Sequence, residues 1–475
     1  MSPLILWFRR DLRLDDNPML AEAVETGRPL IPVFIADDAV MTLGAAPRWR
    51  LGEGLAVFGK RLEAEGSRLV LRRGRALDCL RALVAETGAG AVWWARLYDT
   101  VARERDAGIK QALRGDGVEA RSFPGHLLVE PWQVETGQGG PYRVYTPFWK
   151  AVSARDWPAP CAAPSRLPAP EHWPESDALA DWRLGAAMQR GAAVVARHAR
   201  IGEEAAQARA ETFLGGAVRH YAEARDLPGE AGTSRLSENL SLGEIGPRRL
   251  WARALLLREV EPGHRGAETF MKELVWREFA YHLMYHTPRL LSGNWREEWD
   301  GFDWRQDSKD AERWRRGMTG EPFVDAGMRE MYVTGTMHNR ARMIVGSYLT
   351  KHLLTHWQVG LKWFEDCLID WDPASNAMGW QWVAGSGPDA APYFRIFNPA
   401  TQAEKFDKGA RYRERFVAEL ARAAGKEPGG EAMDFFAAAP CAWDLDPEAP
   451  YPERMVDLSE GRQRALAAYE RRPKS

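Results

Sequence analysis

Two different hydrophobic patterns divide this chain and restrict the folds open to it. In residues 1–130, short apolar runs alternate with amphipathic helical stretches. The runs are Leu4–Phe8, Leu30–Ile35, Arg68–Leu71 and Ala91–Ala95, and the helical stretches lie near Pro18–Glu25, Arg48–Glu65, Leu77–Glu86 and Ala102–Leu113. Strands that alternate with helices at this spacing predict a parallel, doubly wound sheet. No G-x-G-x-x-G fingerprint follows the first run, which argues against the usual dinucleotide site there.

The rest of the chain reads as a linker and a helical region. Six prolines between Trp157 and Pro174 exclude a helix or a central strand and predict an extended linker. From about Ala199 the pattern is helical, with breaks at Pro228-Gly229, Pro262-Gly263 and Gly385-Ser386-Gly387. We therefore predict an N-terminal α/β domain (1–130), an interdomain linker (131–198) and an all-helical domain (199–475).

Composition excludes several classes of protein. Of the 475 residues, 45% are hydrophobic and 27% charged, as in soluble globular proteins. No apolar run approaches the roughly 20 residues of a membrane span, and the six-residue run near the N-terminus precedes its charges, unlike a signal peptide. The 4 cysteines show no C-x-x-C, which argues against a disulfide framework, a zinc ribbon or an iron–sulfur cluster. We expect a cytoplasmic monomer without membrane contact; at a net charge of −2, any nucleic-acid site is a local patch.

Tryptophan is concentrated in the helical region beside polar segments. Eleven of the 21 tryptophans lie between Tyr221 and Phe406, together with GTSRLS (232–237), MHNRARM (337–343) and LIDWDPASNAMGWQW (368–382). An apolar core would exclude these Arg, Asn and Asp residues unless each found a partner. A large planar polar ligand bound inside the helical domain explains both observations.

Four constellations describe such a pocket. The hydroxyls and guanidinium of GTSRLS suit phosphate oxygens, and Glu273, Trp276 and Arg277 are spaced to share one helix face. In MHNRARM, Asn339, Arg342 and Met343 share a face, with Arg340 on another; Asp370 and Asp372 need donors, from Arg342 or a ligand, if they are buried. Alone, the first segment is better explained as a helix cap with a surface arginine and the second as an amphipathic helix with a Glu–Arg pair, and the other two can also be structural. Two His pairs, 282/286 and 352/356, have i, i+4 spacing without H-E-x-x-H, so we expect ordinary histidines and no metal.

These blocks carry a resemblance to a known family. The chain resembles the DNA photolyase/cryptochrome family, most closely the class I cyclobutane pyrimidine dimer photolyases. The resemblance runs through LWFRRDLR (6–13), YTPF (145–148), GTSRLS, WREF, MHNRARM, GWQW, YFRIFNP (393–399) and LAAY (466–469). It covers nearly the whole chain in family order.

The resemblance implies FAD folded in the helical domain. Tyr221, Thr233, Ser234, Leu236 and Ser237 would hold its phosphate and sugar region, with Arg235 nearby. The flavin edge would be lined by Asn339, Arg342, Asp370 and Asp372, and the cofactor set also includes Glu273 and Arg277. Asn376 would face the reactive ring nitrogen, where plant cryptochromes carry Asp; an amide can hydrogen-bond the flavin in either protonation state.

The same resemblance implies a catalytic path and a DNA surface. Trp380, Trp357 and Trp304 match an electron relay, in order from the flavin outward. Trp276 and Trp382 match the indoles beside the flipped lesion, Glu273 matches a carboxyl that hydrogen-bonds a pyrimidine, and Met343 belongs to that pocket. The residues that match DNA contacts are Arg225, Asn339, Arg340, Arg395, Gln402 and Lys405. The expected partner is UV-damaged DNA, with the dimer flipped from the stack.

Departures from the family leave the second chromophore open. Family tryptophans are replaced by Phe270 and Thr336, and the acidic and Asn residues that grip a folate antenna align near Ala102 and Val101. The antenna is therefore methenyltetrahydrofolate, an 8-hydroxy-deazaflavin, or absent.

We predict a deoxyribodipyrimidine photo-lyase that repairs cyclobutane dimers by electron transfer from excited reduced FAD. The alternatives are a cryptochrome-type blue-light photoreceptor, a (6-4) photolyase and a dark electron-transfer flavoprotein. Asn376, Glu273 and Met343 argue against the photoreceptor. The Asn339-Arg340 pair after His338, where (6-4) enzymes carry a histidine pair, favours the cyclobutane dimer.

Overall fold

A parallel sheet forms the N-terminal part of the molecule. The computed structural model describes residues 1–475 except 189–190, 262–263, 391, 394, 441–442 and 473–475. Its five strands lie in the order β3-β2-β1-β4-β5, all parallel. They are β1 (Leu4–Phe8), β2 (Leu30–Ala36), β3 (Val70–Arg73), β4 (Ala91–Ala95) and β5 (Glu119–Phe123). The four predicted runs correspond to β1–β4; β5 is a further strand that the apolar pattern does not indicate.

Helices cover both faces of this sheet, as predicted. The buried side chains of α1 (Pro18–Glu25) and α3 (Ala45–Ala64) form one core with the sheet, and those of α4 (Ala76–Thr87) and α5 (Thr100–Gly115) form a second core on the other face. Asn17 and Asp99 cap α1 and α5 through their side-chain oxygens, which explains where these helices begin. A short helix, α2 (Asp38–Met41), follows β2.

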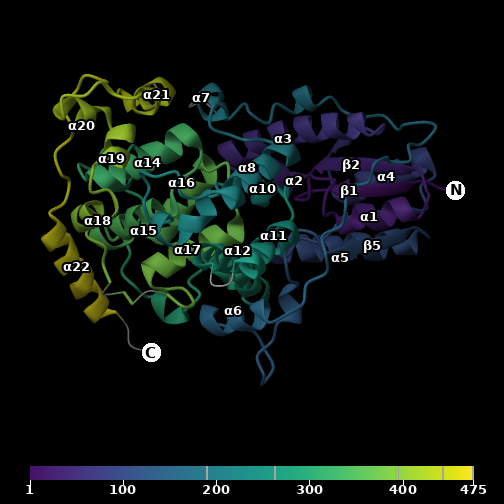
Figure 1. Ribbon diagram of the computed structural model, residues 1–475, viewed down its shortest axis with the longest axis horizontal. Helices are drawn as coiled ribbons and strands as arrows, with labels where there is room; N and C mark the ends of the chain where they lie inside the picture. Colours follow the sequence, from purple (N-terminus) through teal and green to yellow (C-terminus); the bar gives the residue numbers. More distant parts are fainter. Residues whose placement is uncertain (189–190, 262–263, 391, 394, 441–442, 473–475) are drawn as a thin grey trace.

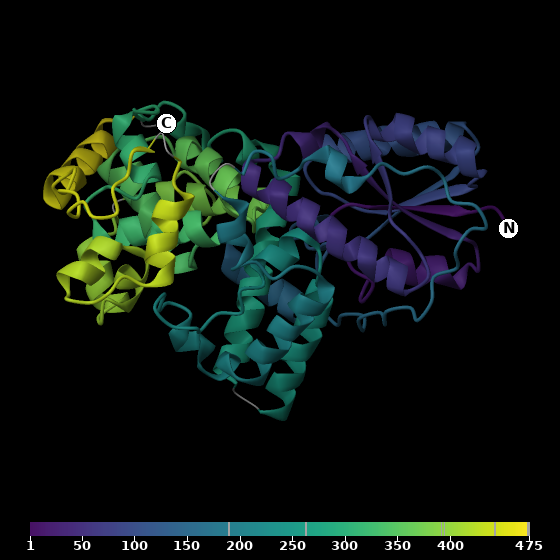
Figure 2. The ribbon, with the colours of Figure 1, turned by 90° about the horizontal axis from the view of Figure 1, so that it is seen from above.

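The proline-rich segment runs along the outside of the α/β part (Figure 2). Its backbone hydrogen-bonds there, for example from Leu30 N to Pro168 O (2.7 Å) and from Asp177 N to Leu71 O (2.9 Å). Short helices α6 (Tyr145–Ser153) and α7 (Ala192–Ala196) lie before and after it. The observed path is extended, as six prolines require.

The remainder is helical and lies beside the sheet domain (Figure 1). Its helices are α8 (Glu203–Gly215), α9 (Tyr221–Ala224), α10 (Ser237–Leu242), α11 (Pro247–Val260), α12 (Arg265–His286), α13 (Lys309–Arg315), α14 (Pro322–Thr334), α15 (Asn339–Ser347), α16 (Trp357–Cys367), α17 (Pro373–Ala384), α18 (Pro399–Phe406), α19 (Arg411–Phe416), α20 (Ala418–Ala423), α21 (Gly430–Ala438) and α22 (Leu458–Arg471). A π-helical turn, η6 (Tyr348–His352), extends α15. Of the predicted breaks, Pro228-Gly229 and Gly385 lie at helix-free positions, and Pro262-Gly263 lies outside the described residues. Within the described chain, no helix combines the length and apolar character that a membrane crossing requires.

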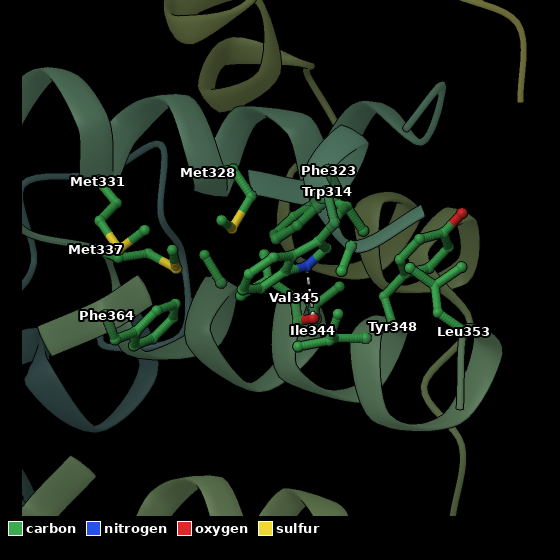
Figure 3. Close-up of a cluster of buried hydrophobic side chains, with 14 of the residues drawn as sticks. Trp314, Phe323, Met328, Met331, Met337, Ile344, Val345, Tyr348, Leu353 and Phe364 are labelled. Atoms are coloured by element: carbon green, nitrogen blue, oxygen red, sulfur yellow. Dashed lines mark hydrogen bonds between the residues drawn. The ribbon is translucent and has the colours of Figure 1, made fainter. Parts of the chain in front are cut away.

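Two apolar cores support the helical part. One surrounds α12; the other lies around α14, α15 and α16. Figure 3 shows part of the second, in which Trp314 Nε1 donates to Val345 O across 3.1 Å. Arg50 of α3, fully buried, joins the α/β part to this helical part through Glu238 (3.2 Å) and Glu244 (2.6 Å). Removing both carboxylates would leave the buried Arg50 charge without a carboxylate partner.

Candidate flavin and DNA site

The segment 232–237 follows α9 after a short connection and ends at the first residue of α10. Gly232 is required, because a Cβ there would lie 2.6 Å from Ala224 Cβ and 2.9 Å from Ala224 O. Arg235 adopts a left-handed backbone (φ 52°). The side chains differ in exposure: Leu236 is buried, Thr233 and Ser234 are half-buried, and Arg235 and Ser237 are exposed. Tyr221, buried at the start of α9, contacts Phe213 and Phe270 edge-on.

Arg342 forms an ion pair with Asp370, one of the two carboxylates that were predicted to need a donor. Its Nη2 lies 2.6 Å from Asp370 Oδ2, and its Nε donates to Met337 O across 2.9 Å. The Asp370 side chain is 3% exposed, and its other oxygen, Oδ1, is buried without a hydrogen-bond partner in the described structure. An unpaired carboxylate oxygen calls for a donor, which a ligand N–H would supply.

Asp372 organises the start of α17. Its Oδ1 accepts from Ser375 N (2.8 Å), and its backbone oxygen accepts from Asn376 Nδ2 (3.0 Å). Tyr281 OH donates to Asp372 Oδ2 at 2.5 Å. Burial and the Asp372 charge raise the pKa of Tyr281, so this hydroxyl stays protonated. This bond turns the amide nitrogen of Asn376 toward the backbone, and the predicted contact of Asn376 with the flavin stays a prediction.

The three predicted residues on one face of α12 have three different partners. Glu273 forms an ion pair with Arg225 of the chain after α9, and burial raises the pKa of Glu273 despite that partner. Trp276 stacks on Tyr145 of α6, with ring centroids 3.6 Å apart and planes 5° from parallel. The local Glu273–Arg277 pair that i, i+4 spacing offers is replaced by these longer-range contacts.

Arg277 belongs to a buried network that joins α12 to the chain after β5. Its Nη1 donates to Glu278 Oε1 (3.0 Å) and its Nη2 to His126 Nε2 (2.8 Å). Glu278 Oε2 in turn accepts from Leu128 N (2.7 Å) and Val129 N (3.1 Å). Burial and the Arg277 charge lower the pKa of His126 well below its usual value, so His126 is neutral and Nε2 is free to accept. Arg277 therefore connects α12 to the N-terminal part, and its cofactor role stays a prediction.

Tyr281 lies between this network and Asp372. Its OH is 2.8 Å from His126 Nε2, but its single proton goes to Asp372, so the two groups are neighbours without a hydrogen bond when Nε2 accepts from Arg277. Sequence reasoning missed His126, Glu278 and Tyr281, since no local spacing links residue 126 to residues 277–281. The one available signal is the run of polar residues on α12, which an amphipathic helix explains equally well.

Four of the six predicted DNA contacts meet at one cavity. Its volume is ≈ 420 Å³, and its lining residues are Glu223, Asp226, Leu227, Arg340, Arg395, Phe397, Gln402, Lys405 and Phe406. Four of the predicted contacts are therefore neighbours, although they come from α15, α18 and the segment before α18. Arg225 lies one residue from the lining residue Asp226, in its ion pair with Glu273.

The charge in this cavity is partly neutralised. Arg340 Nη2 lies 2.7 Å from Asp226 Oδ2, and its guanidinium lies 4.2 Å from the centre of the Phe406 ring. Lys405 Nζ lies 5.0 Å from the same ring, and Lys405 and Arg395 are exposed. Asp226 and Phe406 are functional candidates that the sequence did not reveal.

The remaining lesion-pocket candidates occupy the first turns of α15 and the end of α17. Asn339 is exposed at the first position of α15, and Met343 is half-buried one turn further on. Trp382 is half-buried near the end of α17. His338 caps α15 through Nδ1, which accepts from Arg340 N (3.2 Å), and burial lowers the pKa of His338 to about 4. His338 is therefore a neutral cap.

The three relay candidates are all buried. Trp380 lies against α16, where a Cβ at Gly360 would come 2.1 Å from its ring. Trp357 begins α16 and donates to Asn294 Oδ1 at 2.9 Å. Its ring neighbours His356 (5.5 Å between centroids), which neighbours Trp304 at 5.7 Å. Trp304 is 8% exposed, so the outermost predicted position is a covered indole.

The His pairs are accounted for by backbone contacts. His282 Nδ1 and His286 Nε2 are both within hydrogen-bond distance of Pro131 O, at 3.0 and 3.1 Å. His356 caps α16, and His352 contacts Phe397 O at 3.1 Å. Among the described residues, no group of three or more His, Cys, Asp or Glu has the arrangement of a metal site.

Ion pairs lie at the crevice where strand order reverses. Between the ends of β1 and β4, Arg9 donates to Ala95 O and lies 2.7 Å from Asp106. Arg105 lies 2.6 Å from Asp37 beside it. This crevice is the usual ligand position in doubly wound sheets, so a second chromophore there would have to break these contacts. At the folate-related positions, Ala102 is buried and Val101 is 74% exposed.

Comparison with known proteins identifies the family. Residues 4–170 match the DNA photolyase model, and residues 270–471 match the FAD binding domain of DNA photolyase. The deoxyribodipyrimidine photo-lyase of Agrobacterium fabrum is 47% identical over 98% of this chain and 98% of its own. Among solved structures, a bacterial class III photolyase from Agrobacterium tumefaciens matches with a TM-score of 0.90 and 46% identity, over 99% of this chain and 97% of that one. An archaeal photolyase from Sulfolobus tokodaii, described with two FAD molecules, matches with a TM-score of 0.80 and 28% identity, over 99% of this chain and 100% of that one.

The chain therefore belongs to the DNA photolyase family. The predicted family, the α/β plus helical fold and the FAD cofactor are confirmed, and with them the assignment as a photolyase enzyme. The residues present fit FAD: the orphan Asp370 Oδ1 needs a donor, and the half-buried hydroxyls at 233–234 offer donors to phosphate. The roles of the individual site residues and the domain boundaries at 130 and 198 stay predictions.

Proposed function

We propose that this chain repairs cyclobutane pyrimidine dimers in DNA with blue light. When bound, reduced FAD would supply the excited electron that opens the dimer. The protein's part is to hold the cofactor, to accept the flipped dimer beside it and to exclude water. Related proteins named deoxyribodipyrimidine photo-lyase support the substrate class.

One observation carries the proposal: helix α15 joins the two sites. Arg342 on one face is paired with Asp370 at the predicted flavin edge, at 2.6 Å. Arg340, two residues earlier, lines the basic cavity with Arg395 and Lys405. A DNA strand held in that cavity would lie within one helix width of the flavin, so a flipped base has a short path to it.

Individual residues divide the work. Glu273 and Trp276, both on α12, have different partners, and the half-buried Glu273 would offer its oxygens, or a proton, to the pyrimidine edge. Trp276 has Tyr145 on one face, which fixes the plane on which a dimer would rest. Trp380, Trp357 and Trp304 would carry an electron inward to recharge the flavin.

The photolyase subclass is a finer question. The motif resemblance points to class I, whereas the structure with 46% identity is described as class III. Because that similarity extends over 99% of the chain, we favour class III. We also infer that an antenna in the crevice beside Arg9 and Asp106 would have to displace this ion pair.

The experiment compares two lesions. Purified protein with FAD reduced is mixed with one oligonucleotide that holds a cyclobutane thymine dimer and with another that holds a (6-4) product. The dimer is restored under blue light and not in the dark, and the (6-4) oligonucleotide is unchanged. Repair of the (6-4) product would replace the substrate assignment, and no repair of either would favour a photoreceptor.

A further inference from the structure

A buried lysine lies behind the DNA-facing cavity. Lys351, in the π-helical turn η6, is 1% exposed. Its Nζ donates to Arg395 O across 3.0 Å and lies 5.2 Å from the centre of the Tyr393 ring. Among the described residues, no carboxylate forms an ion pair with Lys351, and the charged group that acts on it is another cation, Arg395. Burial, with a smaller effect of Arg395, lowers the pKa of Lys351 to about 7.

Two neighbours of Lys351 contact the same short segment. Ser347 Oγ accepts from Phe397 N across 3.2 Å, and His352 Nε2 lies 3.1 Å from Phe397 O. Burial lowers the pKa of His352, so the ring is neutral and its Nε2–H donates to that carbonyl. Ser347 and His352 are buried at 0% and 1% exposure. Three buried side chains, one at the end of α15 and two in η6, thus contact the backbone of Arg395 and Phe397.

The geometry of η6 explains how they converge. In a π-helical turn the extra residue changes the direction of successive side chains, and such turns occur at functional sites. The turn is itself anchored, because Arg464 of α22 donates to His352 O. The segment it holds ends at the Asn398 cap of α18, the helix that carries Gln402 and Lys405.

A structural role alone does not explain a lysine at this position. A buried ammonium with one hydrogen bond costs stability, and an apolar side chain of similar volume would fill the space more favourably. On the other side of the segment, Arg395 and Phe397 line the cavity that we assign to DNA. The lysine is therefore best explained by what it does to that surface.

We propose that Lys351, with Ser347 and His352, is a positioning residue for DNA binding, which fixes the backbone of residues 395–397 so that Arg395 points its guanidinium into the cavity. The proposal rests on the proposed function, since the phosphate contact of Arg395 is part of it. Lys351 itself is buried and does not touch DNA.

The test replaces Lys351 with methionine, and the control is Lys362→Met on the exposed side of α16. We expect Lys351→Met to keep its FAD and to melt at the same or a higher temperature. Its affinity for dimer-containing duplex falls about tenfold, as when one charge-assisted phosphate contact is lost. The slope of log K against log salt flattens by about 0.9, as in Arg395→Ala. Lys362→Met should change none of these.

A double-mutant cycle decides whether Lys351 acts through Arg395. If it does, Lys351→Met adds no further loss of affinity to Arg395→Ala. Additive losses would overturn the proposal. Should Lys351→Met fail to fold, Ser347→Ala replaces it in the same cycle, and an unchanged affinity in that variant would equally overturn it.

Hydrogen exchange separates this inference from the proposed function. The Phe397 amide donates to Ser347 Oγ, so it should exchange faster in Lys351→Met and in Ser347→Ala than in the parent protein. That readout needs neither DNA nor light. Unchanged exchange would remove the positioning role even if repair is observed, whereas faster exchange without any DNA binding by the parent protein would leave the positioning intact and reject the proposed function.

Discussion

Arg342 Nη2 and Asp370 Oδ2 lie 2.6 Å apart, while the other oxygen of the Asp370 carboxylate is buried without a partner. This ion pair connects α15 to the loop before α17. Both elements carry residues that we predict to line the flavin edge. The pair is half-satisfied in a way that suits a ligand: the protein supplies the cation, and the second oxygen is left for a donor from outside the chain. The ion pair contributes to the fold, and its predicted contact with the cofactor is open to test.

We expect Asp370→Asn to lose FAD and stability together. Removing one partner of a buried ion pair costs about 3–5 kcal/mol, and Arg342 is only partly exposed, so part of that cost should appear. Flavin absorbance per protein after gel filtration and urea unfolding measure the two effects. The control is Asp434→Asn, whose ion pair with Arg197 lies at the surface. Full flavin content and unchanged stability in Asp370→Asn would remove Asp370 from the flavin edge.

We expect Trp380→Phe to stop light-driven reduction of oxidised FAD while chemically reduced enzyme still repairs. Phenylalanine fills most of the space beside Gly360, and it is too hard to oxidise to pass an electron. The indole nitrogen of Trp380 has no partner in the described structure, so no hydrogen bond is lost. Flavin bleaching under blue light with an external reductant is the measurement.

Trp94→Phe is the matched control for this change. Trp94 is equally buried, and its indole nitrogen is likewise unpartnered, but it lies in β4 of the sheet. Photoreduction should be normal there. Normal photoreduction in Trp380→Phe would exclude Trp380 from the relay.

The sequence predicted local features well and distant partners poorly. The apolar runs placed β1 and β4 to the residue, because a buried parallel strand is a continuous apolar run. It missed β5, whose sequence EARSF is polar because the strand lies at the edge of the sheet. The contact between Arg342 and Asp370, which are 28 residues apart, was predicted only because a buried carboxylate needs a donor.

Other parts of the site could not be read from the chain. Glu273 and Arg277 are one helical turn apart, yet their partners are Arg225 and His126, which tertiary packing alone brings near. The exposure of Trp304 likewise depends on what covers it: Phe302 and Trp299 pack on its ring. Periodicity defines which face of a helix is polar, but not which distant residue meets that face.

The carboxyl of Glu278 should make stability depend on pH. Burial raises the pKa of Glu278 to about 7, against 4.5 for an exposed group. Between those values the folded state holds a proton that the unfolded state has lost, so stability falls as pH rises through that window. We expect the unfolding free energy of the parent protein, relative to Glu278→Gln, to fall by about 2 kcal/mol between pH 5 and pH 8.

Urea unfolding of both proteins at the two pH values isolates this group, because other titrating residues are common to both. The amide of Glu278→Gln does not titrate, although it meets Arg277 less well at every pH. A difference that does not change with pH would show that Glu278 is ionised in the folded protein throughout, with Arg277 holding it so.

The ion pair between Arg340 and Asp226 allows a sharper test of the DNA surface than removal of a cation alone. Asp226 Oδ2 lies 2.7 Å from Arg340 Nη2 in the cavity, so the carboxylate neutralises a guanidinium where a phosphate is expected. We expect Asp226→Asn to tighten binding of dimer-containing and undamaged duplex alike, since phosphate contacts carry no sequence information. The slope of log K against log salt should steepen by up to about 0.9, one further released counterion. Arg340→Ala should change both quantities in the opposite direction, with the flavin spectrum unaltered in each variant.

Glu230→Gln, which removes a carboxylate paired with exposed Arg411 outside the cavity, serves as the control for a simple change in net charge. If Asp226→Asn and Glu230→Gln shift affinity equally, the effect belongs to the overall field of the protein and Arg340 does not touch the strand.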